Sequence, residues 1–177
     1  MPKEPAVTAA HPYFPPEPFR DVTILDGPEA PLAVVEVHDY PLARMPELMD
    51  GVFSRLFPAL ADAGTAPAGP ALAMHTRIPT GTVDMGVGVP VTTPLRVPVE
   101  IGAGYTAVAS AIPAGRVAAT SHLGPYNGLG AAWGRLMQDV AAAGHAPTSR
   151  FFEVYVTEPI PDADPASMRT DLAVFLE

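Results

Sequence analysis

One acidic residue stands out by its neighbours. Glu153 lies in the middle of residues 150–157 (RFFEVYVT), whose β-branched and aromatic side chains are typical of a strand. Because side chains alternate along a strand, Glu153 shares its face with Phe151 and Tyr155. A carboxylate between two aromatic rings needs an ionic partner or a cationic ligand, or else takes up a proton. Glu153 is therefore the first candidate for binding or catalysis.

A structural interpretation of Glu153 stays open beside the functional one. Exposed faces of antiparallel sheets are common, and a carboxylate on such a face is solvated or pairs with a nearby guanidinium. The arginines that could serve are Arg77, Arg116 and Arg150. What separates the two interpretations is whether an aromatic cavity surrounds the carboxylate.

Aromatic residues elsewhere in the chain could form a cage around a cation together with Glu153, because aromatic faces attract organic cations. The candidates are Trp133, Tyr126, Tyr155, Phe151 and Tyr105. His75 joins them because alternation in its strand places it on the face expected to line a hollow. Two candidates also have structural interpretations, since Trp133 fits the apolar stripe of its helix and Tyr126 fits a surface turn.

Other kinds of chemistry lack their usual sequence patterns. The chain contains no cysteine, which excludes disulfides, thiol nucleophiles and Cys-ligated metals. Its histidines do not show metal-ligand spacing, and its glycine pairs are not followed by the lysine of a phosphate-binding loop. No Ser-His-Asp triad can be argued. We therefore expect neither a metal nor a cofactor.

Charge and hydropathy narrow the class of partner. The chain carries 19 acidic against 10 basic residues, a formal charge of −9, so direct nucleic-acid binding is not expected. No apolar run is long enough to span a membrane, and the N-terminus lacks the apolar core of a signal peptide. The expected location is the cytoplasm, and the expected partner is a small molecule.

Two similar sets of elements must position these residues. Alternating apolar residues predict strands, and apolar residues spaced by four, such as Leu48, Val52 and Leu56, predict a helix. The first set comprises a strand at 32–40, a helix at 46–63 and strands at 71–78 and 83–91; the second comprises strands at 105–112 and 116–122, a helix at 127–143 and strands at 150–157 and 168–176. Each set contains the order strand, helix, strand, strand.

The two sets also resemble each other in sequence. At an offset of 80 residues the pattern Gly-x-Ala-Pro follows both helices, at residues 64–67 and 144–147. We interpret this as an internal duplication. One domain would cover residues 20–177, with module one at about 32–91 and module two at about 105–177, after a proline-rich N-terminal tail at 1–19.

This organisation predicts an α+β fold. Two duplicated strand-helix-strand-strand modules would form one curved antiparallel sheet, with two helices on the outer face and a ligand hollow on the inner face. We expect the aliphatic sets, Leu72 with Met74 and Phe152 with Val154, to face the helices, and the set of Glu153 to line the hollow. Gly86 and Gly88 would leave room there for a ligand. Tyr13, Phe14 and Phe19 of the tail would fold over the mouth of the hollow.

Four short motifs, in order over about residues 20–177, resemble GyrI-like small-molecule-binding domains. They are Asp84–Val91 (DMGVGVPV), Ile112–Arg116 (IPAGR), Ser121–Leu129 (SHLGPYNGL) with Ala132 and Trp133, and Phe152–Tyr155 (FEVY) with Thr157 and Pro159. The resemblance implies a duplicated strand-helix-strand-strand fold with a ligand pocket between the modules. It also implies that Glu153 is the polar contact, with Tyr126, Trp133 and Tyr155 lining the pocket.

The resemblance implies three alternative functions. The first is binding of bulky hydrophobic, aromatic or cationic compounds for drug or toxin sensing or sequestration. The second is hydrolysis of reactive cyclopropane-bearing natural products, in which Glu153 activates water and Tyr155 or Tyr126 donates a hydrogen bond. The third is a protein-interaction module that acts on DNA gyrase. In the family this domain often follows a DNA-binding helix-turn-helix, but residues 1–19 are too short and proline-rich to form one.

Overall fold

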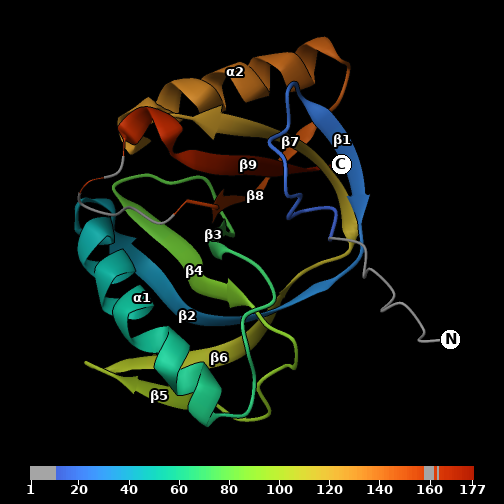
Figure 1. The fold of residues 1–177 in the computed structure, drawn as a ribbon. Helices are drawn as coiled ribbons and strands as arrows, with labels where there is room; N and C mark the ends of the chain where they lie inside the picture. Colours follow the sequence, from blue (N-terminus) through green and yellow to red (C-terminus); the bar gives the residue numbers. More distant parts are fainter. Residues whose placement is uncertain (1–10, 158–161, 163) are drawn as a thin grey trace, which may run out of the picture.

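A computed structural model describes residues 11–157, 162 and 164–177. Within these residues the chain forms nine strands and two α-helices (Figure 1). The strands are β1 (Thr23–Gly27), β2 (Ala30–Pro41), β3 (Ala71–His75), β4 (Thr82–Pro90), β5 (Val99–Gly102), β6 (Tyr105–Ile112), β7 (Gly115–Leu123), β8 (Pro147–Tyr155) and β9 (Arg169–Leu176). The helices are α1 (Met45–Asp62) and α2 (Leu129–Ala142). Pro159 and the first ten residues of the predicted tail lie outside the described residues.

All nine strands pair antiparallel in one sheet, in the order β1-β7-β9-β8-β3-β4-β2-β6-β5. Module one contributes β3-β4-β2, and module two contributes β8-β9-β7 and also β6. The two modules therefore meet at two places, where β2 pairs with β6 and at the seam where β3 pairs with β8. At this seam Ala73 lies directly opposite Glu153. The predicted α+β class, with a curved antiparallel sheet and two helices, is confirmed (Figure 1).

Each helix packs on the sheet through one apolar stripe. In α1 the buried residues are Leu48, Val52, Leu56 and Leu60, the spacing of four that predicted the helix. In α2 they are Ala132, Leu136 and Val140. Both helices stop at a glycine that takes a left-handed conformation, Gly64 with φ +78° and Gly144 with φ +80°, which residues with a Cβ rarely adopt. Neither helix is long and apolar enough to cross a membrane.

The side of the sheet that carries the cavity differs from the expectation. Leu72, Met74, Phe152 and Val154 pack in a core on the face away from both helices. Glu153 and Tyr155 point to the helix-bearing face, where they line a pocket. The alternation did separate the two sets of side chains, but the aliphatic set was assigned to the wrong side. Both faces of this sheet are covered, so an aliphatic face does not have to be the helix face.

The N-terminal segment covers the other face. We call residues 11–20 the N-terminal strap. Tyr13 is 2% exposed, its ring contacts Phe152 edge-on at 5.4 Å, and its hydroxyl donates to the Gly115 carbonyl at 3.1 Å. Phe14 and Phe19 pack against the same core. The prediction that these aromatic residues cover the mouth of the pocket is therefore wrong, because they fill the opposite face.

The room predicted at two glycines of β4 is occupied by the neighbouring strand. A Cβ built on Gly88 would lie 1.9 Å from the Ala33 carbonyl oxygen, and one on Gly86 would lie 3.1 Å from the Val34 side chain. These glycines allow β2 and β4 to approach closely. The expectation that they make space for a ligand is wrong.

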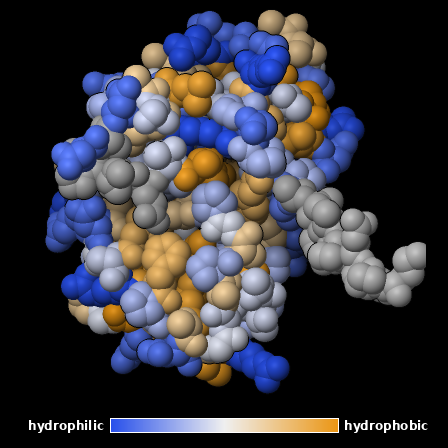
Figure 2. Space-filling model, viewed as in Figure 1, coloured by the Kyte–Doolittle hydropathy of each residue, from blue (hydrophilic) through white to orange (hydrophobic). Residues whose placement is uncertain are grey.

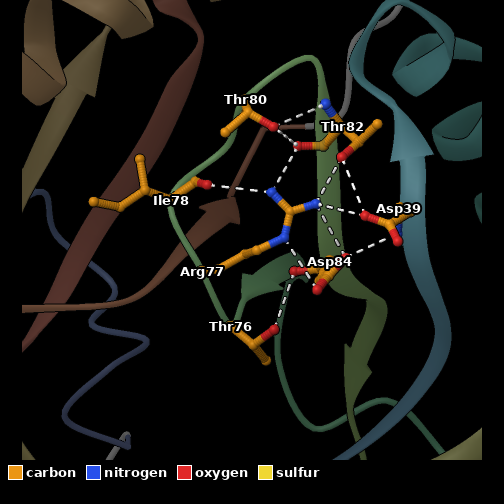
Figure 3. Close-up of polar contacts among 7 residues, drawn as sticks. All are labelled: Asp39, Thr76, Arg77, Ile78, Thr80, Thr82 and Asp84. Atoms are coloured by element: carbon orange, nitrogen blue, oxygen red, sulfur yellow. Dashed lines mark hydrogen bonds and ion pairs between the residues drawn. The ribbon is translucent and has the colours of Figure 1, made fainter.

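A polar cluster at the β3–β4 connection fixes the start of α1 (Figure 3). The Arg77 guanidinium pairs with Asp84 at 3.0 Å and donates to the Thr82 hydroxyl at 2.7 Å. Asp84 accepts from the Asp39 backbone N–H at 2.8 Å, which ties the end of β2 to β4. Beside it, the Leu42 N–H donates to the Gly81 carbonyl at 3.0 Å, and α1 begins three residues later.

Candidate ligand-binding pocket

A cavity of about 870 Å³ lies between α1, the start of α2, and the seam of the two modules. We call it the inter-helix pocket. Its floor includes Ala71 of β3 and Glu153 and Tyr155 of β8. On the face shown in Figure 2, hydrophobic residues gather toward the middle of the molecule, between the regions of α1 and α2, whereas hydrophilic residues cover much of the periphery. The volume falls in the range of small-molecule sites.

The wall of the pocket comes from a second apolar stripe of α1. Met45, Met49, Phe53 and Phe57 recur every four residues and line the cavity. They are only partly buried and lie beside the stripe that packs on the sheet. The apolar stripe that predicts the core of α1 does not include them, so they were not among the predicted site residues. A second apolar row on the same helix could have predicted them, because a helix that packs on one sheet requires only one apolar row.

Glu153 is held by two neutral donors. The Trp133 Nε1–H donates to its Oε1 at 2.8 Å, and the Tyr155 hydroxyl donates to its Oε2 at 2.9 Å. Within the described residues no arginine pairs with this carboxylate. Arg77 binds Asp84 and Asp39, and Arg116 binds Asp26. The carboxylate is therefore positioned but its charge is not neutralised.

Tyr155 links this carboxylate to two further aromatic rings of the pocket. Tyr155 contacts Phe53 and Tyr126 edge-on, with ring centroids 6.5 Å and 6.0 Å apart. Burial raises the pKa of Tyr155 well above its usual value, and the Glu153 charge raises it further. Burial, followed by the same charge, also raises the pKa of Tyr126. Both phenols stay protonated at neutral pH, so Tyr155 remains a donor to Glu153.

The remaining candidates form a layer beside the pocket. Trp133 contacts Phe151 edge-on at 4.9 Å, and Phe151 stacks on His75 at 4.4 Å. Burial lowers the pKa of His75 to about 4, so its ring is neutral near pH 7. The Nδ1 of His75 has no hydrogen-bond partner among the described residues. Neither His75 nor Phe151 lines the cavity, and Trp133 reaches the site through its bond to Glu153.

Tyr105 lies elsewhere. It packs in the core beneath α1, where a Cβ on Gly51 would come within 2.7 Å of its ring. Of the seven sequence candidates, the structure thus brings Glu153, Tyr155 and Tyr126 together in the pocket, and Trp133 contacts Glu153 through its hydrogen bond. In the described part of the chain no group of three or more His, Cys, Asp or Glu residues could hold a metal ion.

Solved structures of other proteins share this fold. No protein-family model and no curated protein matched the sequence. The C-terminal domain of EcmrR superimposes with a TM-score of 0.68 at 17% identity, over 89% of this chain and 97% of that one. SAV2435 bound to tetraphenylphosphonium gives 0.59 at 11% identity, over 89% and 94%. A hydrolase from Listeria innocua gives 0.59 at 12% identity, over 92% and 94%. At these identities the likeness establishes the fold, and this is the fold that the resemblance to GyrI-like domains predicted.

Proposed function

We propose that this protein binds bulky, hydrophobic, cationic small molecules in the inter-helix pocket, for sensing or sequestration. The proposal rests on the position of Glu153, whose partly buried carboxylate lies on the floor of an apolar, aromatic cavity. Its hydrogen bonds come from Trp133 and Tyr155, which are neutral, so they orient the carboxylate and leave its negative charge for a ligand.

The shape and lining of the pocket support a large aromatic ligand. The α1 residues that line it run from Met45 to Phe57, which corresponds to about 18 Å along a helix axis. Thioether and aromatic side chains adapt to many shapes and attract cations through sulfur and ring faces. Among the described residues that line the pocket, none is basic. An anion of the same size would therefore meet an unfavourable potential.

The comparisons support the same class of ligand. SAV2435 carries tetraphenylphosphonium, a lipophilic cation without hydrogen-bond donors. Such a cation suits a carboxylate whose two oxygens already accept hydrogen bonds, because the attraction is coulombic and requires no donor on the ligand.

Hydrolysis is a second candidate. A neighbour in fold is a hydrolase, and Glu153 retains lone pairs that could accept a proton from water. However, the Tyr155 proton is engaged by Glu153 and would have to leave it to stabilise developing negative charge on a substrate. The resting geometry therefore favours binding over turnover.

The test is a titration with two tetraphenyl ions of the same shape and opposite charge, tetraphenylphosphonium and tetraphenylborate, in separate experiments. We expect the cation to bind and the borate to bind far more weakly. A unit charge at about 5 Å, with an effective dielectric constant of about 20, contributes about 3 kcal/mol. Solvent screening reduces this energy. Glu153→Gln should therefore lower the affinity for the cation by at least about tenfold, and the affinities for the two ions should become more similar.

The matched control is Glu36→Gln, which removes the same charge from an exposed position outside the pocket. It should leave both affinities within about twofold of wild type. Equal affinity of Glu153→Gln and wild type for the cation would refute the role of Glu153. Wild-type turnover of a cyclopropane-bearing electrophile, lost in Glu153→Gln, would establish the hydrolase instead.

A further inference from the structure

The inter-helix pocket contains a second carboxylate. Asp50 lines it from α1 and is exposed, whereas Glu153 is partly buried on the floor. Nothing in the described part of the chain forms an ion pair or a side-chain hydrogen bond with Asp50. The contrast is with Glu47 on the same helix, which Arg44 pairs at 3.0 Å. Asp50 therefore presents an uncompensated charge at the rim of an apolar cavity.

The helix geometry places Asp50 on the pocket side. It precedes Phe53, Ser54 and Phe57 by three, four and seven residues, and all of them line the same cavity. Residues at these spacings share one face of a helix. Glu47, one turn earlier on α1, does not line the pocket. The position of Asp50 thus follows from the row that forms the pocket wall.

The duplication shows that the two modules contribute one acid each, from different elements. At the offset of 80 residues, the counterpart of Glu153 is Ala73, which also lies opposite it across the β3–β8 seam. The counterpart of Asp50 is Gly130 of α2. A Cβ on Gly130 would contact nothing within 4 Å, so packing does not demand glycine there. Module two supplies the carboxylate on the floor, and module one supplies the carboxylate on the rim.

We propose that the pocket prefers elongated dications, with one cationic centre at Glu153 and the second at Asp50. This inference rests on the proposed function. Met49 and Phe53 of the α1 wall would contact the apolar body between the two charges. A monocation at Glu153 leaves Asp50 unused, whereas a second cationic centre at the rim gains attraction at little desolvation cost, since Asp50 is already exposed.

The test compares two ligands that differ by one charge. Decamethonium carries a trimethylammonium group at each end of an alkyl chain, and decyltrimethylammonium carries one on the same chain. Asp50→Asn should lower the affinity for decamethonium by about two- to fivefold, which matches the energy of an exposed ion pair. The affinity for decyltrimethylammonium should stay unchanged within error. The effect should shrink as salt is raised, because the rim charge is screened. Glu153→Gln should weaken both ligands.

Asp62→Asn is the matched control. It removes the same charge from the same helix at an exposed position about 18 Å along the axis, outside the inter-helix pocket, and should change neither affinity. If Asp50→Asn changes both affinities equally, or neither, the dication inference is wrong while the proposed function stands. If wild type binds neither tetraphenylphosphonium nor these two ligands, the proposed function is refuted, and the inference falls with it.

Discussion

The N-terminal strap is expected to stabilise the domain without touching the ligand, and replacing Tyr13 tests this. The ring of Tyr13 is buried between Phe152 and Gly27, and its hydroxyl donates to the Gly115 carbonyl. Truncating a buried aromatic side chain to alanine costs about 3–5 kcal/mol, and the hydrogen bond contributes about 1 kcal/mol of the effect. Tyr13→Ala should therefore lower the free energy of unfolding by about 4 kcal/mol, and Tyr13→Phe by about 1 kcal/mol.

The assay is urea denaturation of both variants, followed by calorimetric titration of the folded proteins with tetraphenylphosphonium. For a domain of this size the Tyr13→Ala change corresponds to a fall in Tm of about 10 °C. The dissociation constant should stay within about twofold of wild type, because Tyr13 packs on the face of β8 away from the pocket.

Phe57→Ala gives the opposite control. This residue lines the pocket and is partly buried, so its truncation should weaken the ligand more than Tyr13→Ala does and destabilise the fold less. A loss of less than about 1 kcal/mol in Tyr13→Ala would mean that the strap is not docked in solution. Weaker ligand binding at unchanged stability would mean that the strap covers the pocket after all.

Further predictions concern the stability of the fold at two buried positions and one exposed position. Because burial lowers the pKa of His75 from 6.5 to about 4 in the folded state, the unfolded chain binds more protons between these values, and stability falls as pH drops through that window. His75→Gln should remove up to about 3 kcal/mol of this fall when its free energy of unfolding is compared with that of wild type by urea denaturation from pH 7 to pH 4. If the free energies of the two proteins change with pH in parallel, the prediction is contradicted. Gly88→Ala should destabilise by about 3 kcal/mol, because its Cβ would meet the Ala33 carbonyl. Gly130→Ala should raise the free energy of unfolding by up to about 1 kcal/mol. Urea denaturation of both glycine variants measures these changes, and equal effects of the two substitutions would refute the packing argument.

The duplicated architecture could be predicted because both helices carry complete local signals. Leu48, Val52, Leu56 and Leu60 specify the buried stripe of α1, and the Gly-x-Ala-Pro pattern marks the end of each helix. The strands follow from alternation, which is also local. Glu153 could be singled out for the same reason, since its neighbours Phe151 and Tyr155 are aromatic and share its face. These inferences need no knowledge of what covers the sheet.

The face that carries the pocket could not be predicted in this way. Alternation assigns Phe152 and Glu153 to opposite faces, but it does not say which face receives the helices. An aliphatic face fits a helix or any other apolar cover equally well. Here the cover for Phe152 is the strap, and the proline-rich composition of residues 11–20 gives no periodic signal that would predict a docked segment. Trp133 illustrates the same limit, because it both packs against Phe151 and binds Glu153, which one apolar stripe cannot reveal.

A buried ion pair in the last strand, β9, anchors the strap. Arg169 and Asp171 are 7% and 2% exposed and meet at 2.7 Å. The guanidinium also donates to the carbonyls of Pro15, Pro16 and Glu17, at 3.0–3.2 Å. Proline lacks an N–H but keeps its carbonyl, so this segment can accept hydrogen bonds without requiring partners for its own donors. In the sequence, the polar residues 169–171 at the start of an otherwise apolar strand indicate that a polar segment docks there.

The two faces of β8 contact different parts of the molecule. Phe152 faces the strap, while Glu153 and Tyr155 face the pocket. Beyond β8, the hydroxyl of the pocket residue Thr157 accepts from the Arg169 N–H at 3.1 Å, which connects the pocket floor to the anchor of the strap. Without the strap, Arg169 would keep Asp171 but lose its three carbonyl partners, and unsatisfied buried donors are costly. A single substitution such as Tyr13→Ala should therefore leave the pocket intact, whereas removing residues 1–20 should disturb Thr157 and lower both stability and ligand affinity. The two perturbations together separate packing of the strap from its support of the pocket floor.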